Sequence, residues 1–265
     1  MALSRRALLA QAAVVLATVA TVGCRPANGA SPRADPTQAP PADRPIASWT
    51  LTGGFTMAGV QALRPPRLVV YSDGEVIADA AYRSRLDPDQ LKSLLDHLSA
   101  DLRAPSASPT VAIGPSIVDA PTTVLTAWDG QAIRSISAYG LDELRDEKVY
   151  GQAWYDARDR LGELYKTVTA TAQPFLGTKV RVVTEPVPAD ANGKTAAPWP
   201  AQVVPPRTPD PSNRELARED LEGQAARDAV RLLTRDLDQR GAWPTYRIAD
   251  GRLVQASWRY LLPSE

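Results

Sequence analysis

Cysteine and histidine occur once each among the 265 residues, and phenylalanine and methionine only twice each. A single histidine excludes any site that needs two histidines from one chain, such as the common zinc-hydrolase motifs. A single cysteine excludes a disulfide within the chain, so its stability must come from burial and hydrogen bonding. Neither Gly-x-Ser-x-Gly nor Ser-x-x-Lys occurs. We therefore identify no catalytic residue, metal site or cofactor site.

An excess of charge of either sign is also lacking. Lysine and arginine together number 30, as do aspartate and glutamate, and removing a leader that contains Arg5 and Arg6 leaves 28 basic residues against 30 acidic ones. Arginines are interleaved with aspartates along most of the chain instead of forming a basic stripe. This balance argues against nucleic acid as a partner.

The N-terminus has the three-part layout of a secretory signal. Two arginines, Arg5 and Arg6, precede an apolar run over 7–22 that ends at Gly23-Cys24. The run is shorter than the roughly 20 residues that cross a bilayer as a helix. We therefore predict a signal peptide over 1–23. Ser4-Arg5-Arg6 also resembles the twin-arginine export signal, and the choice between that route and the general route stays open.

Cys24 is the predicted site of lipid attachment. The residues before it resemble a lipoprotein signal box, with Gly23 fitting well and Thr21 standing where leucine is usual. Acyl chains on Cys24 would anchor the protein in the bilayer, on the outer face of the cytoplasmic membrane. The alternative is a chance cysteine in an ordinary signal peptide.

A proline-rich segment follows the cysteine. Six of the 23 residues from Arg25 to Ala47 are proline, and no hydrophobic period appears. We predict a disordered tether over 24–47 and a single globular region over 48–265. A second stretch at 185–211, with eight prolines in 27 residues, is predicted to be a long loop or inner linker.

The globular region repeats one local order. Apolar runs on either side of Asp73-Gly74 predict a hairpin, and a helix capped by Asp87 follows. A second hairpin around Asp129-Gly130 and a helix from about residue 150 repeat this order, which suggests a duplicated strand-strand-helix unit.

The C-terminal part contributes three more predicted elements. Lys179 to Thr184 is predicted to be a strand. Ser212 is predicted to cap a helix over about 213–237, and Asp250-Gly251 to join two last strands that pack on the rest. We therefore predict an α+β fold, in which antiparallel hairpins form one or two sheets with helices packed on one face.

The remaining chemical candidates have structural explanations. His97 lies off the leucine stripe of its helix and is expected in solvent. Asn192-Gly193-Lys194-Thr195 lacks the first glycine of a phosphate-binding loop. Acidic clusters at 87–89 and 142–147 fit helix capping and a solvated charge run. Trp199, between two prolines, is the one residue that we single out as a possible partner contact, and the favoured alternative is that it docks the loop onto its own domain.

Four short segments give the chain a resemblance to a widespread group of uncharacterised lipoproteins from high-GC Gram-positive (actinobacterial) bacteria. They are Gly53-Gly54-Phe55, Asp73-Gly74, the segment 119–123 and Leu261-Leu262-Pro263. The resemblance implies an anchored envelope protein organised as one unit, and it supplies no catalytic residues. We expect a non-enzymatic module that binds an envelope protein or cell-wall ligand. The alternative is a carboxylate-dependent envelope hydrolase.

Overall fold

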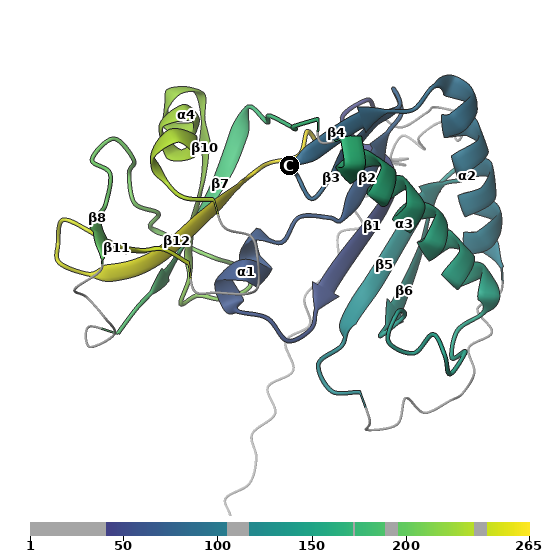
Figure 1. The fold of residues 1–265 in the computed structure, drawn as a ribbon, viewed down its shortest axis with the longest axis horizontal. Coiled ribbons are helices and arrows are strands. Elements are labelled where there is room, and N and C mark those ends of the chain that lie inside the picture. Colours follow the sequence, from purple (N-terminus) through teal and green to yellow (C-terminus); the bar gives the residue numbers. More distant parts are fainter. Residues whose placement is uncertain (1–40, 105–116, 172, 189–195, 236–242) are drawn as a thin grey trace, which may run out of the picture. The chain divides into compact units, whose positions relative to one another are not determined.

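The computed structural model describes residues 41–104, 117–171, 173–188, 196–235 and 243–265. Two sheets and four helices make up this part of the chain (Figure 1). Nearly all strand pairs are antiparallel, the exception being β8 with β11. The predicted α+β class is confirmed. The described chain contains no helix that is both long enough and apolar enough to cross a membrane.

The first sheet has the strand order β4-β3-β2-β1-β5-β6. Its strands are β1 (Pro45–Gly53), β2 (Leu68–Tyr71), β3 (Glu75–Ala78), β4 (Tyr82–Arg85), β5 (Pro121–Trp128) and β6 (Ile133–Tyr139). Both predicted hairpins are present, as β2-β3 and β5-β6. Strand β1 joins them by pairing with β2 on one side and β5 on the other. Because β1 begins at Pro45, residues 45–47 belong to the sheet, although the sequence placed them in the tether.

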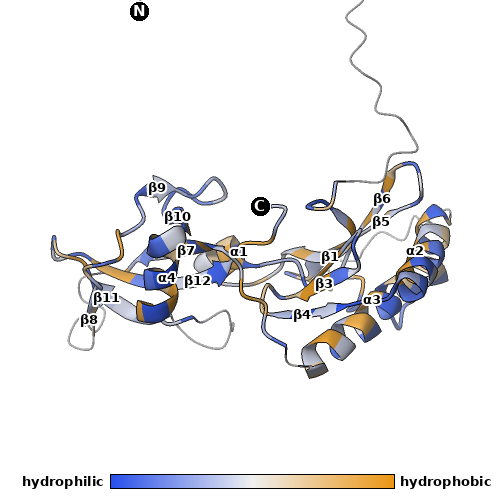
Figure 2. Cartoon of the chain, turned by 90° about the horizontal axis from the view of Figure 1, so that it is seen from above, coloured by the Kyte–Doolittle hydropathy of each residue, from blue (hydrophilic) through white to orange (hydrophobic). Residues whose placement is uncertain are grey.

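Two helices, α2 (Pro88–Arg103) and α3 (Gln152–Thr171), cover one face of this sheet (Figure 1). Asp87 and Gln90 form the predicted capping box at the start of α2. Buried side chains from the strands and both helices form one cluster, which includes Trp49, Leu125 and Leu161. Figure 2 shows hydrophilic residues along the outer side of these helices. This pattern is that of amphipathic helices packed on a sheet.

Strands β2 and β3 are buried on both faces. Leu68 and Val70 pack against the helices, whereas Val69 and Tyr71, which point the other way, pack with residues of the second sheet. The period of two in strand side-chain direction explains this division. The C-terminal part therefore packs on the first part, as the sequence analysis expected.

The second sheet has the order β8-β11-β12-β7-β10-β9. Its strands are β7 (Lys179–Pro186), β8 (Ala197–Pro198), β9 (Thr208–Pro209), β10 (Ala217–Glu222), β11 (Thr245–Arg247) and β12 (Leu253–Tyr260). Helix α4 (Gly223–Leu232) packs on β7 and β10, and the short helix α1 (Ala58–Leu63) contacts β7 and β12. The predicted strand at 179–184 and the last hairpin are confirmed.

The helix predicted over about 213–237 is present only from 223 to 232, and its N-terminal part is wrong. Residues 217–222 form strand β10, which pairs along its whole length with β7, and the bidentate ion pair between Arg181 and Asp220 fixes the pairing (2.7 and 2.8 Å). The helix begins only at Gly223, whose φ of +60° turns the chain out of the strand. Ser212 donates to Asp210 in a turn and caps no helix.

The described residues of the proline-rich stretch, 185–188 and 196–211, lie along the second sheet within the globular part. Strands β8 and β9 form the two edges of that sheet, where a proline without an N–H group is tolerated. Val203 and Asp210 are buried. The stretch is therefore no linker between separate domains.

Candidate functional site

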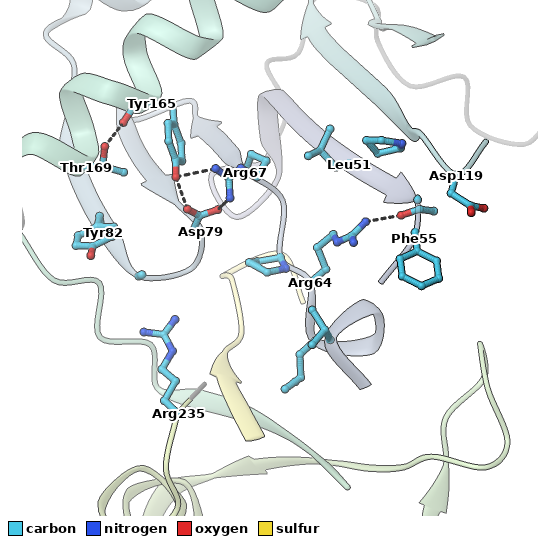
Figure 3. Close-up of a pocket in the computed structure, with 17 residues that line it drawn as sticks. Leu51, Phe55, Arg64, Arg67, Asp79, Tyr82, Asp119, Tyr165, Thr169 and Arg235 are labelled. Carbon is cyan, nitrogen blue, oxygen red and sulfur yellow. Dashed lines mark hydrogen bonds and ion pairs between the residues drawn. The ribbon is translucent and has the colours of Figure 1, made fainter. Parts of the chain in front are cut away.

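A pocket of about 780 Å³ opens beside β1, α1, the β3–β4 turn and α3 (Figure 3). Apolar side chains of Leu51, Val60 and Leu63 form part of its wall. Its charged and phenolic groups are Arg64, Arg67, Asp79, Tyr82, Asp119, Tyr165 and Arg235. We call it the arginine pocket. Three guanidinium groups in one concave site make it the strongest candidate for a binding site in the described chain.

Three of these groups form a closed set of interactions. Arg67 Nη1 lies 3.0 Å from Asp79 Oδ1, and Arg67 Nη2 donates to the Tyr165 hydroxyl at 2.8 Å. The same hydroxyl donates to Asp79 Oδ2 at 2.6 Å (Figure 3). The Arg67 guanidinium also lies over the Tyr165 ring, 4.6 Å from its centre. Each group is therefore held by the other two, and this wall of the pocket is preorganised.

The pKa values reflect this burial. Burial raises the pKa of Asp79 above its ordinary value, although the Arg67 charge opposes the change. Burial and the hydrogen bond to Asp79 raise the pKa of Tyr165 to about 12. The phenol therefore stays protonated at neutral pH and keeps donating to the carboxylate.

The two other arginines are held by backbone carbonyls. Arg64, which ends α1, donates to the Gly53 carbonyl at 2.7 Å. Arg235, which follows α4, donates to the Ala80 carbonyl at 3.0 Å. Within the part of the chain that the structure describes, no carboxylate lies within ion-pair distance of either guanidinium. Burial lowers the pKa of both.

Backbone strain gathers around the same pocket. Four non-glycine residues of the described chain have positive φ, and three of them, Asp79 (+50°), Ala80 (+47°) and Asp119 (+69°), lie in the pocket or directly beside it. Gly53 and Gly54 also have positive φ, and a Cβ on Gly54 would meet Pro121 backbone atoms at 3.3 Å. Residues in sparsely populated backbone conformations cluster at functional sites.

Trp199, the contact residue singled out from the sequence, lies elsewhere. Its indole is half-buried, donates to the Val203 carbonyl at 2.5 Å and meets the Tyr246 ring edge-on with centres 5.5 Å apart. It thus packs the proline-rich stretch onto its own sheet. Its role as a partner contact stays a prediction.

The structure places the other sequence candidates outside the pocket. His97 is exposed on α2, with Nδ1 2.7 Å from the Ser93 carbonyl, as expected. Asp87 caps α2, and the acidic residues at 142–147 are exposed. Cys24, Arg5, Arg6 and the 192–195 motif lie outside the described residues. Among described residues, no cluster of three or more His, Cys, Asp or Glu side chains is placed to bind a metal.

Sequence reasoning assigned no function to any charged group of the arginine pocket, and Asp119 was noted only within a segment of the resemblance. One local signal of a cluster of positive charge was visible in the sequence, because Arg64 and Arg67 lie on either side of two prolines. The glycine pair before Phe55 was noted only for its resemblance, and Asp79 stands in a turn without glycine. Nothing local to the sequence links these segments to Tyr165 or Arg235.

Comparison with known proteins adds no assignment: the chain matches no family model, no curated protein and no solved structure.

Proposed function

We propose that this chain is an exported lipoprotein, held on the outer face of the cytoplasmic membrane by lipid on Cys24, and that its folded part is a non-enzymatic binding module of the cell envelope. The signal-like residues 1–23, the single cysteine and the proline-rich segment behind it support the anchor. The arginine pocket supports the binding role.

The single observation that carries the binding role is which polar groups of the pocket already have hydrogen-bond partners within the protein. Asp79 is occupied by Arg67 and Tyr165, whereas Arg64 and Arg235 each donate one observed hydrogen bond, to a backbone carbonyl. A guanidinium has five N–H donors. The pocket therefore offers donors to a ligand from fixed positions, an arrangement suited to recognition.

Filling the pocket should abolish ligand binding. Thr169 on α3 lines the pocket, so Thr169→Trp places an indole within it. We expect the full-length protein, purified in mild detergent and incubated with envelope extract, to retain a small molecule that native mass spectrometry detects. Thr169→Trp should reduce its occupancy at least tenfold.

Thr167→Trp is the matched control. Thr167 lies on the same helix and its hydroxyl makes the same kind of bond to the carbonyl four residues earlier, but it is exposed and outside the pocket. Two results would refute the binding role. One is an equal loss of ligand occupancy in both variants. The other is an unaltered protein that retains no ligand and turns over a wall-derived substrate.

Replacing Cys24 by Ala should abolish lipid labelling. Without the thiol no thioether to diacylglycerol can form, so we expect no incorporation of an alkyne-tagged palmitate and loss of membrane retention through lipid. Ser31→Ala, in the same proline-rich segment, should label normally. Unchanged labelling of the Cys24 variant would exclude this residue as the lipid site.

A carboxylate-dependent envelope hydrolase remains the second candidate, because Asp79 and Asp119 both line the pocket. In Figure 3 Asp119 lies on the far side of the drawn pocket from Asp79. Release of a product from cell-wall material by the unaltered protein, lost in both Asp79→Asn and Asp119→Asn, would establish hydrolysis in place of binding.

A further inference from the structure

Strand β6 forms an edge of the first sheet that stays open in the described part of the chain. In Figure 1 it lies beside β5, with which it pairs over its whole length without a bulge. No other described strand pairs with its outer side. An open edge presents unpaired N–H and C=O groups, which native proteins normally protect. The proposed function concerns the arginine pocket and gives this edge no role.

The other three sheet edges are protected. At the opposite edge of the same sheet, β4 is bridged by the segment after α3, through Tyr82 and Pro174. In the second sheet the edge strands β8 and β9 are two residues long, and each ends in a proline. Strand β6 has seven residues and no proline, and its one charged residue, Arg134, is paired with Asp129 at 2.6 Å. The described chain therefore gives β6 none of the usual protections.

Two hydrogen bonds show which backbone groups of β6 point outward. The Gly140 N–H donates to the Pro121 carbonyl at 2.9 Å, at one end of the β5–β6 ladder. The Asp129 N–H donates to the Ala132 carbonyl at 3.0 Å, at the other end. In an antiparallel ladder, hydrogen-bonded pairs alternate with non-bonded ones. The backbone groups that point away from β5 are therefore those of Ile133, Ser135, Ser137 and Tyr139.

These outward groups are accessible to another strand. The side chains of Ser135 and Ser137 are exposed, and no described group bonds to their backbone on the outer side. The Tyr139 carbonyl accepts the Tyr150 hydroxyl at 2.7 Å, but a carbonyl has a second lone pair. A further strand can therefore pair here without displacing any part of the described chain.

The edge is complementary to itself. About a two-fold axis perpendicular to the sheet at Ile136, two antiparallel copies of β6 would place these residues opposite each other: Ser135 and Ser137, Ile133 and Tyr139, Arg134 and Ala138. Each of the first two pairs would exchange two backbone hydrogen bonds. The third places the single charge of the strand opposite a methyl group, so no like charges face each other.

We infer that β6 pairs with β6 of a second copy of this chain. The first sheets of the two copies then form one continuous sheet, with α2 and α3 of both copies on the same face. A two-fold contact of this kind needs no other sequence, because the same strand supplies both sides. Since β4 is covered, pairing through this sheet ends at two copies. The inference does not depend on the proposed function.

Ser137→Pro tests the inference. Full-length Cys24→Ala protein in neutral detergent, in which no disulfide can join two copies, should be dimeric by native mass spectrometry at about 10 µM. Proline has no N–H and is tolerated on an edge strand where that group faces outward. Two-fold symmetry removes two hydrogen bonds per dimer, so the dissociation constant should rise at least tenfold. Ser137→Thr, which keeps the N–H, is the matched control and should dimerise normally.

A pair of charge variants supplies a test without proline. Ser135→Lys with Ser137→Lys puts lysines opposite each other in the dimer and should weaken it at least tenfold, whereas Ser135→Lys with Ser137→Asp puts opposite charges there and should keep it. Thermal unfolding checks that each variant folds. A monomeric unaltered protein would overturn the inference. So would a dimer that is equally stable in Ser137→Pro and in the double lysine variant.

Discussion

Glu265→Gln is expected to lower the free energy of unfolding by about 3 kcal/mol. The Glu265 carboxylate binds the Arg259 guanidinium through two contacts of 2.6 and 2.7 Å and also accepts the Leu262 N–H at 3.0 Å. Arg259 has only 3% of its side chain exposed. An amide in place of the carboxylate would leave that buried cation without its counter-charge.

The same pair predicts a pH dependence. Burial alone would raise the pKa of Glu265, but the hydrogen bonds and charge of Arg259 outweigh it and hold the pKa below its ordinary value. A lowered pKa in the folded state contributes stability that is present above the unfolded pKa, near 4.3, and is lost as pH falls through the folded value. The unaltered protein should therefore lose more stability on acidification below about pH 4 than Glu265→Gln does.

Urea unfolding followed by tryptophan fluorescence measures both effects. Asp96→Asn is the control, because Asp96 pairs with Lys92 on the exposed surface of α2. That change should leave the unfolding midpoint nearly unaltered. If Glu265→Gln proves as mild as the control, the Arg259 pair does not stabilise the fold in the way its geometry indicates.

Trp258→Ala should cost about 4 kcal/mol of unfolding free energy. The ring is 5% exposed on β12, packs edge-on against Tyr260 with centres 5.2 Å apart, and donates from Nε1 to the Leu233 carbonyl at 3.0 Å. Truncation would leave a cavity and an unpaired carbonyl in the core that the two sheets share. It would also remove a ring that supports Arg235.

Trp258→Phe separates these contributions. Phenylalanine keeps most of the buried surface but has no N–H, so its cost should approach that of one buried hydrogen bond, about 1 kcal/mol. Chemical unfolding of both variants gives the two values. A Phe variant as unstable as the Ala variant would mean that the hydrogen bond to Leu233, and not packing, dominates at this position.

The hairpins could be predicted because their signals are local. In β2-β3 and β5-β6 the two strands and the Asp-Gly turn between them lie within about 20 residues, and the capping box of α2 spans four. Strand β1 was not predicted and its first residues were placed in the tether, since its most extensive pairing is with β5, far along the chain. The incorrect helix prediction at 213–222 has the same origin. The prediction used only local sequence signals, whereas the structure of this segment is set by its pairing with β7.

The arginine pocket could not be predicted for a related reason. Tyr165 and Asp79 lie 86 residues apart, and Arg235 and Ala80 lie 155 apart. An arginine in a sequence with balanced charge gives no sign of lacking a carboxylate partner, because that depends on which side chains the fold brings near it. The sequence analysis could exclude chemistries that need particular residue types, but it could not locate a site made by long-range contacts.

The chain that leaves α3 passes along the outer edge of β4. The backbone N–H of Arg83 donates to the Gln173 carbonyl at 2.9 Å, and that of Phe175 donates to the Ala81 carbonyl at 2.8 Å. Tyr82 and Pro174 form an isolated antiparallel β-bridge. An uncovered strand edge is a template for pairing with another molecule. Proteins tethered to one membrane collide far more often than proteins free in solution. For a lipid-anchored protein, this covered edge would thus oppose self-association on a crowded surface.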